Sequence, residues 1–155
     1  MNYADTLVRI ERPTGSSLSA YDIPLSFFGL DSFQVTASSL DKDSKRDANG
    51  KLKRNVLNTV VLKAEWNTPL MYMEDFQTVM AEIRKRYFTS VQPNNKREKK
   101  VRASVYCIER DQYITSDFYV PDITPQIHHN SDKGLILKPV RIALIDYGYT
   151  LPNNW

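Results

Sequence analysis

The chain has 155 residues, of which 41% are hydrophobic and 25% are charged, and its formal net charge is +3. These values are typical of a globular domain and exclude wholesale disorder, and so small a charge excess does not by itself indicate a nucleic-acid partner. The single cysteine, Cys107, excludes an intrachain disulfide. No apolar run reaches the roughly twenty residues of a membrane span, and the N-terminus lacks an apolar signal-peptide core. We therefore expect one domain over residues 1–155, soluble and made in the cytoplasm.

Two short extended segments are expected near the N-terminus. Thr6–Ile10 has the composition of a short strand, which Pro13 and the loop after it would close. Tyr21–Leu30 is apolar but contains Pro24, which has no amide hydrogen to donate to a sheet. We expect an edge strand or an irregular segment there.

Residues 31–67 are predicted to form a strand, a long polar loop and a second strand. The first strand, Ser32–Leu40, and the second, Val56–Trp66, alternate apolar and polar residues with the period of two of a half-buried strand. The apolar face of the second consists of Val60, Leu62, Ala64 and Trp66. The loop Asp41–Arg54 contains Asn49-Gly50, a turn signal. A loop longer than about a dozen residues is usually disordered or functional.

One amphipathic helix is predicted over about residues 69–88. Thr68 is a suitable N-cap, and Pro69 suits the first helical position. Acidic residues near the start and basic residues near the end match the helix dipole. Apolar residues at spacings of three and four form one stripe: Tyr72, Phe76, Val79, Met80, Ile83 and Tyr87.

The second half of the chain is predicted to be β-rich. Val101–Glu109 and Tyr113–Val120 alternate and form a second hairpin. Pro121–Gly134 is expected as a loop, and Leu135–Tyr147 as one long strand with Pro139 at an edge or bulge. The expected class is mainly β (α+β): a small β-sandwich or barrel with one packed amphipathic helix and a long extended hairpin loop.

Residues suited to catalysis or metal binding are few. His128 and His129 are adjacent, and neighbours in an extended segment point to opposite faces, so a shared metal ion is geometrically poor. Cys107 is expected to be a small buried hydrophobe. No phosphate-binding, dinucleotide-binding or nucleophile-elbow motif occurs. We predict no metal, no cofactor and no enzyme activity. A pocket around His128 and Tyr119 is the enzymatic alternative, and it has the least support.

Two basic clusters are the most distinctive feature of the composition. The first is the Asp41–Arg54 loop, with six basic and three acidic residues. Its candidate contact residues are Lys42, Lys45, Arg46, Asp47, Asn49, Lys51, Lys53 and Arg54. The second lies in and just after the polar connector Gln92–Lys100 and consists of Lys96, Arg97, Lys99, Lys100 and Arg102, with Glu98 as its acid.

These clusters have three interpretations. They are solvated connectors, or they bind nucleic acid, or the mixed-charge loop docks on a neighbouring subunit with acids and bases pairing across the contact. Nucleic-acid binding favours aromatic residues among the charges, and neither cluster contains one. Nine tyrosines, Trp66 and Trp155 favour a subunit interface or, equally, the core of one small domain.

From Asp31 to Tyr147, two alternating strands with a long loop, one helix and further strands follow one another. This order resembles the tail-tube fold of long-tailed bacteriophages, which recurs in tube, distal tail and baseplate hub proteins. The stretch LDKDSKRDANGKLKRN also resembles small uncharacterised tail-region proteins of Firmicutes phages and prophages. The matching residues would be Asp41, Arg46, Ala48, Gly50 and Arg54.

The resemblance implies a structural virion protein of a phage tail or baseplate, without catalysis. It implies a sixfold ring of identical subunits joined by sheet edges and by the Asp41–Arg54 loop, with neighbouring tail or baseplate proteins as partners. DNA would at most pass through a lumen, and no membrane is involved. The loop is then expected to be mobile in an isolated subunit and ordered in an assembly. The alternative from another class is a β-barrel module that binds single-stranded nucleic acid through Lys96, Lys99 and Lys100.

Overall fold

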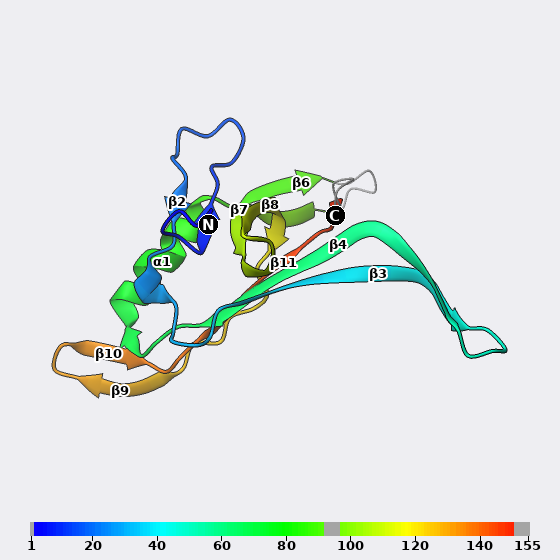
Figure 1. Cartoon of the computed structure of the whole chain (residues 1–155). Helices are drawn as coiled ribbons and strands as arrows, with labels where there is room; N and C mark the ends of the chain where they lie inside the picture. Colours follow the sequence, from blue (N-terminus) through cyan, green and yellow to red (C-terminus); the bar gives the residue numbers. More distant parts are fainter. Residues whose placement is uncertain (1, 92–96, 151–155) are drawn as a thin grey trace.

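The structure is a computed structural model that describes residues 2–91 and 97–150, and most of that backbone is β-strand. It confirms the expected class of a small, mainly β fold with one packed helix (Figure 1). The elements are β1 (Val8–Ile10), β2 (Tyr21–Asp22), β3 (Gln34–Arg46), β4 (Leu52–Asn67), β5 (Met71–Tyr72), α1 (Met73–Lys85), β6 (Phe88–Val91), β7 (Arg97–Cys107), β8 (Gln112–Tyr119), β9 (Ile127–Ser131), β10 (Gly134–Leu137), β11 (Arg141–Asp146) and β12 (Tyr149–Thr150).

The strands of the described ranges form two antiparallel sheets. The larger has the order β12-β4-β11-β8-β7-β1-β2, with β3 paired to β4 and β6 paired to β7. The smaller has the order β5-β10-β9 and lies near the start of α1 (Figure 1). Strand β2 is at an edge, as expected for a segment containing Pro24, and a short 3-10 turn at Leu25–Phe27 follows it.

Alternating strands and the helical stripe supply the core. The predicted inward face of β4 is confirmed, because Val60, Leu62, Ala64 and Trp66 are all at most 2% exposed. In the same way, the buried residues of β7 are Val101, Ala103, Val105 and Cys107. Ile142 and Leu144 of β11 are also buried, as is Val140 just before that strand. The helix adds Phe76, Val79, Met80 and Ile83. Each pattern places one apolar face against the others, which is why the amphipathic elements assemble around a single core.

Trp66 lies at the centre of this core. Its ring packs 4.8 Å from that of Phe28 and 6.2 Å from that of Phe33. It is 1% exposed, so it belongs to the core, the second of its two predicted environments. Trp155, the other tryptophan considered for an interface, lies outside the described residues.

The helix is shorter than the predicted 69–88, because it begins at Met73 and ends at Lys85. Thr68 does not cap it. Its backbone amide donates to the Val140 carbonyl at 2.9 Å, and its Oγ1 accepts from the Val140 amide at 3.0 Å. The next residues then pair with β10 as the strand β5. This tertiary contact keeps residues 68–72 extended and delays the helix by a turn.

The predicted long strand Leu135–Tyr147 is two strands in different sheets. β10 belongs to the small sheet and β11 belongs to the large one. Residues 138–140, which include Pro139, form no strand and connect the two. Proline cannot donate a ladder hydrogen bond, so the strand ends where Pro139 stands. The expected loop Pro121–Gly134 is also wrong in part, because β9 lies within it and pairs with β10.

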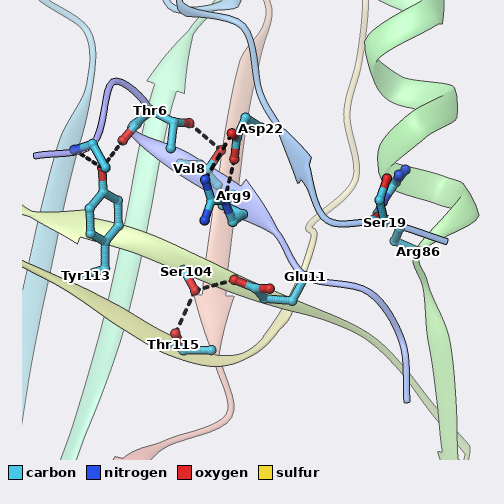
Figure 2. A network of polar contacts seen from close by, with 11 residues as sticks. Thr6, Val8, Arg9, Glu11, Ser19, Asp22, Arg86, Ser104, Tyr113 and Thr115 are labelled. Atoms are coloured by element: carbon cyan, nitrogen blue, oxygen red, sulfur yellow. Dashed lines mark hydrogen bonds and ion pairs between the residues drawn. The ribbon is translucent and has the colours of Figure 1, made fainter. Parts of the chain in front are cut away.

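The N-terminal segment, for which the tail-tube resemblance offers no counterpart, is held by a polar network (Figure 2). Ser104 Oγ donates to Glu11 Oε1 at 2.7 Å and shares a hydrogen bond of 2.6 Å with Thr115 Oγ1. Since a carboxylate only accepts, Thr115 donates in the second bond. The buried Arg86, just past the helix, donates to the Ser19 carbonyl at 2.9 Å. The N-terminal segment is therefore an integral part of the fold.

The Asp41–Arg54 segment is not a loop. Strands β3 and β4 continue to pair out to Arg46 and Leu52, and only the turn at 47–51 separates them. The turn closes through the Asp47 amide, which donates to the Lys51 carbonyl at 2.9 Å, with Gly50 at φ +78°. The sequence did not predict these strands because their side chains are mostly polar and do not alternate with apolar ones. Two paired strands are joined by backbone hydrogen bonds, which need no apolar face. We call residues 40–58 the β-arm.

Candidate functional site

The β-arm projects from the body as a two-stranded ribbon (Figure 1). Every residue from 40 to 57 is exposed as a whole except Asp47, and the Asp41 side chain is partly covered by its contact with Arg54. At about 3.3 Å per residue, the ribbon reaches roughly 20 Å beyond the body. Within the described chain, the outer edge of β3 has no partner strand, and the other edge of β4 pairs with β12 and β11 only from Thr59 onward. The arm therefore offers two open strand edges.

Some of the predicted contact residues hold the arm together. The Arg54 guanidinium donates to both Asp41 oxygens, at 3.0 and 2.8 Å, and this contact is the main reason that the pKa of Asp41 is lowered. Arg46 Nη1 donates to the Gly50 carbonyl at 2.8 Å. Asp47 Oδ1 accepts from the amides of Asn49 and Lys51, at 3.0 and 2.9 Å. These contacts keep the ribbon and its turn in shape.

Other predicted contact residues have no ion-pair partner within the described chain. Within the described structure no carboxylate forms an ion pair with the arm lysines, which are Lys42, Lys45, Lys51 and Lys53. The arm also exposes large apolar side chains that sequence reasoning missed: Leu40, Leu52, Val56 and Leu57. The sequence does contain a sign of this apolar surface. The buried face of β4 ends at Val60, but apolar residues continue along β4 into the arm. The many charged residues of the segment obscure this apolar pattern in the sequence.

In the second basic cluster, two of the side chains that the structure describes, Lys100 and Arg102, are paired with acidic residues. Lys96 lies outside the described residues, and the connector expected at Gln92–Lys100 is wrong from Arg97 onward, where β7 begins. The Lys100 ammonium lies 2.8 Å from Glu98. Arg102 lies 3.3 Å from Asp117 on β8.

The fold supplies aromatic partners that the local sequence of this cluster lacks. The Lys100 ammonium lies 4.3 Å from the centre of the Tyr147 ring, and the Lys99 ammonium lies 4.7 Å from that of Tyr87. Adjacent residues of a strand point to opposite faces, so these two cation–π contacts are on different sides of β7. Both tyrosines are distant in the sequence, which is why the pattern was not visible there.

An apolar groove of about 610 Å³ lies at the end of the molecule opposite to the β-arm (Figure 1). It is built where β2 and the turn after it, β5, the first turns of α1, β9 and β10 meet. Its lining includes Tyr21, Phe27, Leu70, Tyr72, Asp75, Val79, His128, His129 and Ile136. A second hollow of about 390 Å³ shares Tyr72 and adds Glu74 and Lys133. The groove is larger than the adjoining hollow and has a mainly apolar lining, as ligand and partner sites commonly do.

Both histidines line this groove, which corrects the expectation that they point to opposite faces. In the β9–β10 ladder His129 pairs with Ile136 and Ile127 pairs with Leu137, so His128 is an extra residue in a β-bulge. A bulge interrupts the alternation of side chains. The two rings meet edge to face, with centres 4.9 Å apart.

The ionisable residues of the groove are Asp75, His128 and His129, together with its tyrosines. No group of three or more His, Cys, Asp or Glu able to hold a metal ion occurs among the residues described. Tyr119 does not line the groove, and the centre of its ring lies 5.8 Å from that of Tyr147, so this groove does not bring His128 and Tyr119 together. No helix within residues 2–91 and 97–150 is long and apolar enough to cross a membrane.

Asp146, the last residue of β11, is a buried charge that sequence reasoning also missed. It is 4% exposed, and neither of its oxygens has a hydrogen-bond partner in the described structure. Burial raises the pKa of Asp146. The amides of Leu62 and Gly148 lie near enough to oppose part of this rise, but neither makes a hydrogen bond of standard geometry.

Replacing Asp146 with Asn is expected to stabilise the protein at neutral pH. The raised pKa favours the neutral acid in the folded state, so the stability of the native chain is fullest below the unfolded pKa and falls as the pH rises through the folded pKa. Asp146→Asn removes that loss. Urea unfolding should give a gain on the order of 1 kcal/mol at pH 7 that disappears near pH 3. Exposed Asp132→Asn is the matched control. A variant that keeps the native pH dependence would contradict the assignment.

The fold and its surfaces define a mainly β protein with a projecting β-arm at one end and an apolar groove at the other. Residues 17–147 match the model of a family of unknown function, DUF6711, and the chain belongs to that family. The match includes the β-arm, the helix and the groove. A comparison with curated proteins found no match.

Proposed function

We propose that this protein is a structural component of a phage tail or baseplate and that it assembles with copies of itself into a ring, sixfold in the arrangement that the tail-tube resemblance implies. The observation that carries the proposal is the β-arm, an exposed ribbon with two open edges and exposed apolar side chains. In this proposal the protein acts by assembly, its neighbours are other tail or baseplate proteins, and it resides in the virion.

Such an arm is poorly suited to remain exposed on an isolated subunit. A two-stranded ribbon without a packed face is marginally stable in water. Open strand edges are templates for pairing with another chain, and soluble monomers usually shorten or cover them. The arm is instead extended and braced by the Asp41–Arg54 ion pair. A feature that is both exposed and braced is typical of a surface that a partner covers.

A module that binds single-stranded nucleic acid draws less support. Such a site needs free cations beside exposed rings. Here Lys100 is paired with Glu98, and Arg102 with Asp117. The Lys99 and Lys100 contacts with tyrosines lie on different sides of one strand. The described residues of the cluster therefore form no continuous stacking platform.

The test of the proposal is the composition of virions. In particles purified from a host that carries this gene, mass spectrometry should detect the chain in a constant ratio to the other tail proteins. Deleting the gene should give particles with incomplete tails, and supplying the native gene in trans should restore them. Complete, infectious particles from the deletion strain, or native particles that lack the chain, would contradict the proposal.

A further inference from the structure

Exposed apolar side chains are concentrated on the β-arm and around the groove. The elements that carry these two patches lie at opposite ends of the molecule (Figure 1). Of the twelve large hydrophobic residues exposed in the described structure, four are on the β-arm. Four more line the groove or adjoin its lining in the sequence: Leu25, Leu70, Tyr72 and Ile127. Large exposed hydrophobic residues that gather in one region mark a candidate contact site, whereas singly scattered residues do not. The two patches are therefore the best candidates for the two sides of one interface.

The shapes of the patches are complementary. The β-arm is a narrow projecting ribbon whose apolar side chains extend from both strands. The groove is concave, and its lining is dominated by aliphatic and aromatic residues. A ribbon that enters the groove would remove the apolar surface of both from water, which is the dominant favourable term in most protein association.

The charges of the patches are complementary as well. The β-arm has four lysines without an ion pair in the described chain, among them Lys51 and Lys53 at and just after its tip. The groove has one lining residue with a full negative charge, Asp75, in the first turn of α1. The adjoining hollow contains one acidic and one basic residue, Glu74 and Lys133, so Asp75 supplies the negative charge of the groove itself. Opposite charges around an apolar contact steer encounter and fix the register of the partners.

We propose that the β-arm of one copy docks in the groove of the next copy. The inference rests on the proposed function, because it names the surfaces through which that assembly forms. Arm and groove are at opposite ends of one chain, so each copy gives its arm to one neighbour and receives an arm from another. Such a head-to-tail contact generates a closed ring or an open filament, whereas a contact between two arms would stop at a dimer.

Two variants separate the sides of this interface. The arm variant carries Leu52→Asp and Leu57→Asp, and the groove variant carries Leu70→Asp and Asp75→Lys. All four positions are exposed, so both variants should keep the native circular dichroism spectrum and unfolding midpoint. Leu30→Asp is the control, because Leu30 is 97% exposed and belongs to neither patch.

Sedimentation velocity of each variant and of their mixture tests the geometry. Alone, each variant should associate at least about 30-fold more weakly than the native chain, as expected for the loss of a central contact. An equal mixture should form a heterodimer and nothing larger, because it contains one intact arm and one intact groove. The Leu30→Asp control should assemble like the native chain.

The remaining outcomes overturn the inference or its basis, and they are distinguishable. If the groove variant assembles like the native chain, the arm docks elsewhere, and this inference fails while the proposed function stands. If both variants are monomers but their mixture gives no heterodimer, the contact is not head-to-tail. If the native chain never assembles and is absent from virions, the proposed function fails as well.

Discussion

Removal of the β-arm is expected to leave a folded monomer that no longer assembles. Ser39 and Val60 pair directly across the two strands at the root of the arm, so replacing residues 40–59 with Asn-Gly leaves a two-residue hairpin connection. Residues 40–57 are exposed apart from Asp47 in the turn, Thr59 is half-buried, and the core cluster of the described residues includes none of them. The free energy of unfolding should change by less than about 1 kcal/mol, because few tertiary contacts are lost and the loop to be closed is shorter.

Sedimentation velocity and urea unfolding check this prediction together. The shortened chain should sediment as a monomer at every concentration and unfold at nearly the native urea midpoint. A control that keeps the arm but replaces Lys42 with Ser should still assemble, since one exposed charge contributes little. An armless chain that assembles like the native one would remove the arm from the interface.

Replacing Trp66 with Ala is expected to be the most destabilising single change, costing about 3–5 kcal/mol. The indole is 1% exposed and packs on the rings of Phe28 and Phe33, so its removal leaves a cavity that neighbouring strands cannot fill. The loss is a large part of the roughly 5–15 kcal/mol of a typical domain. Urea unfolding at fixed pH measures it.

The matched control is Trp66→Phe. The indole Nε1 has no hydrogen-bond acceptor in the described part of the chain, so a phenyl ring keeps most of the packing and loses no hydrogen bond. Its cost should stay below about 1.5 kcal/mol. Equal costs for the two variants, or a loss below about 1 kcal/mol for Trp66→Ala, would show that Trp66 does not anchor the core.

The strands and the helical stripe could be predicted because their signals are local. The period of two in β4 and β7 and the spacing of Phe76, Val79 and Ile83 each show which face is buried. The start of the helix could not be predicted, because Thr68 is held by Val140, 72 residues away. Thr68 followed by Pro69 is a typical helix start, but the contact with Val140 keeps this segment extended, and the helix begins only at Met73.

The candidate site was predictable in composition but not in geometry. The density of charged residues indicated the position of the β-arm. The pairing of Arg54 with Asp41 could not be predicted, because it depends on the strand register, which shifts at two places between Ser39 and Asp43. The groove was not predictable, because it is formed by segments from β2 to β10, and because the bulge at His128 turns both histidines toward it. Local patterns cannot report a surface that only tertiary packing brings together.

The central claim is that this protein functions by assembling through its β-arm, and the mass of the native chain in solution tests it most directly. Sedimentation velocity over a wide range of concentrations should reveal a discrete species of several subunits, six if the ring of the resemblance forms, that the armless chain never reaches. A native chain that remains a 17.9 kDa monomer at every concentration, alone and with its neighbouring tail proteins, would contradict the account.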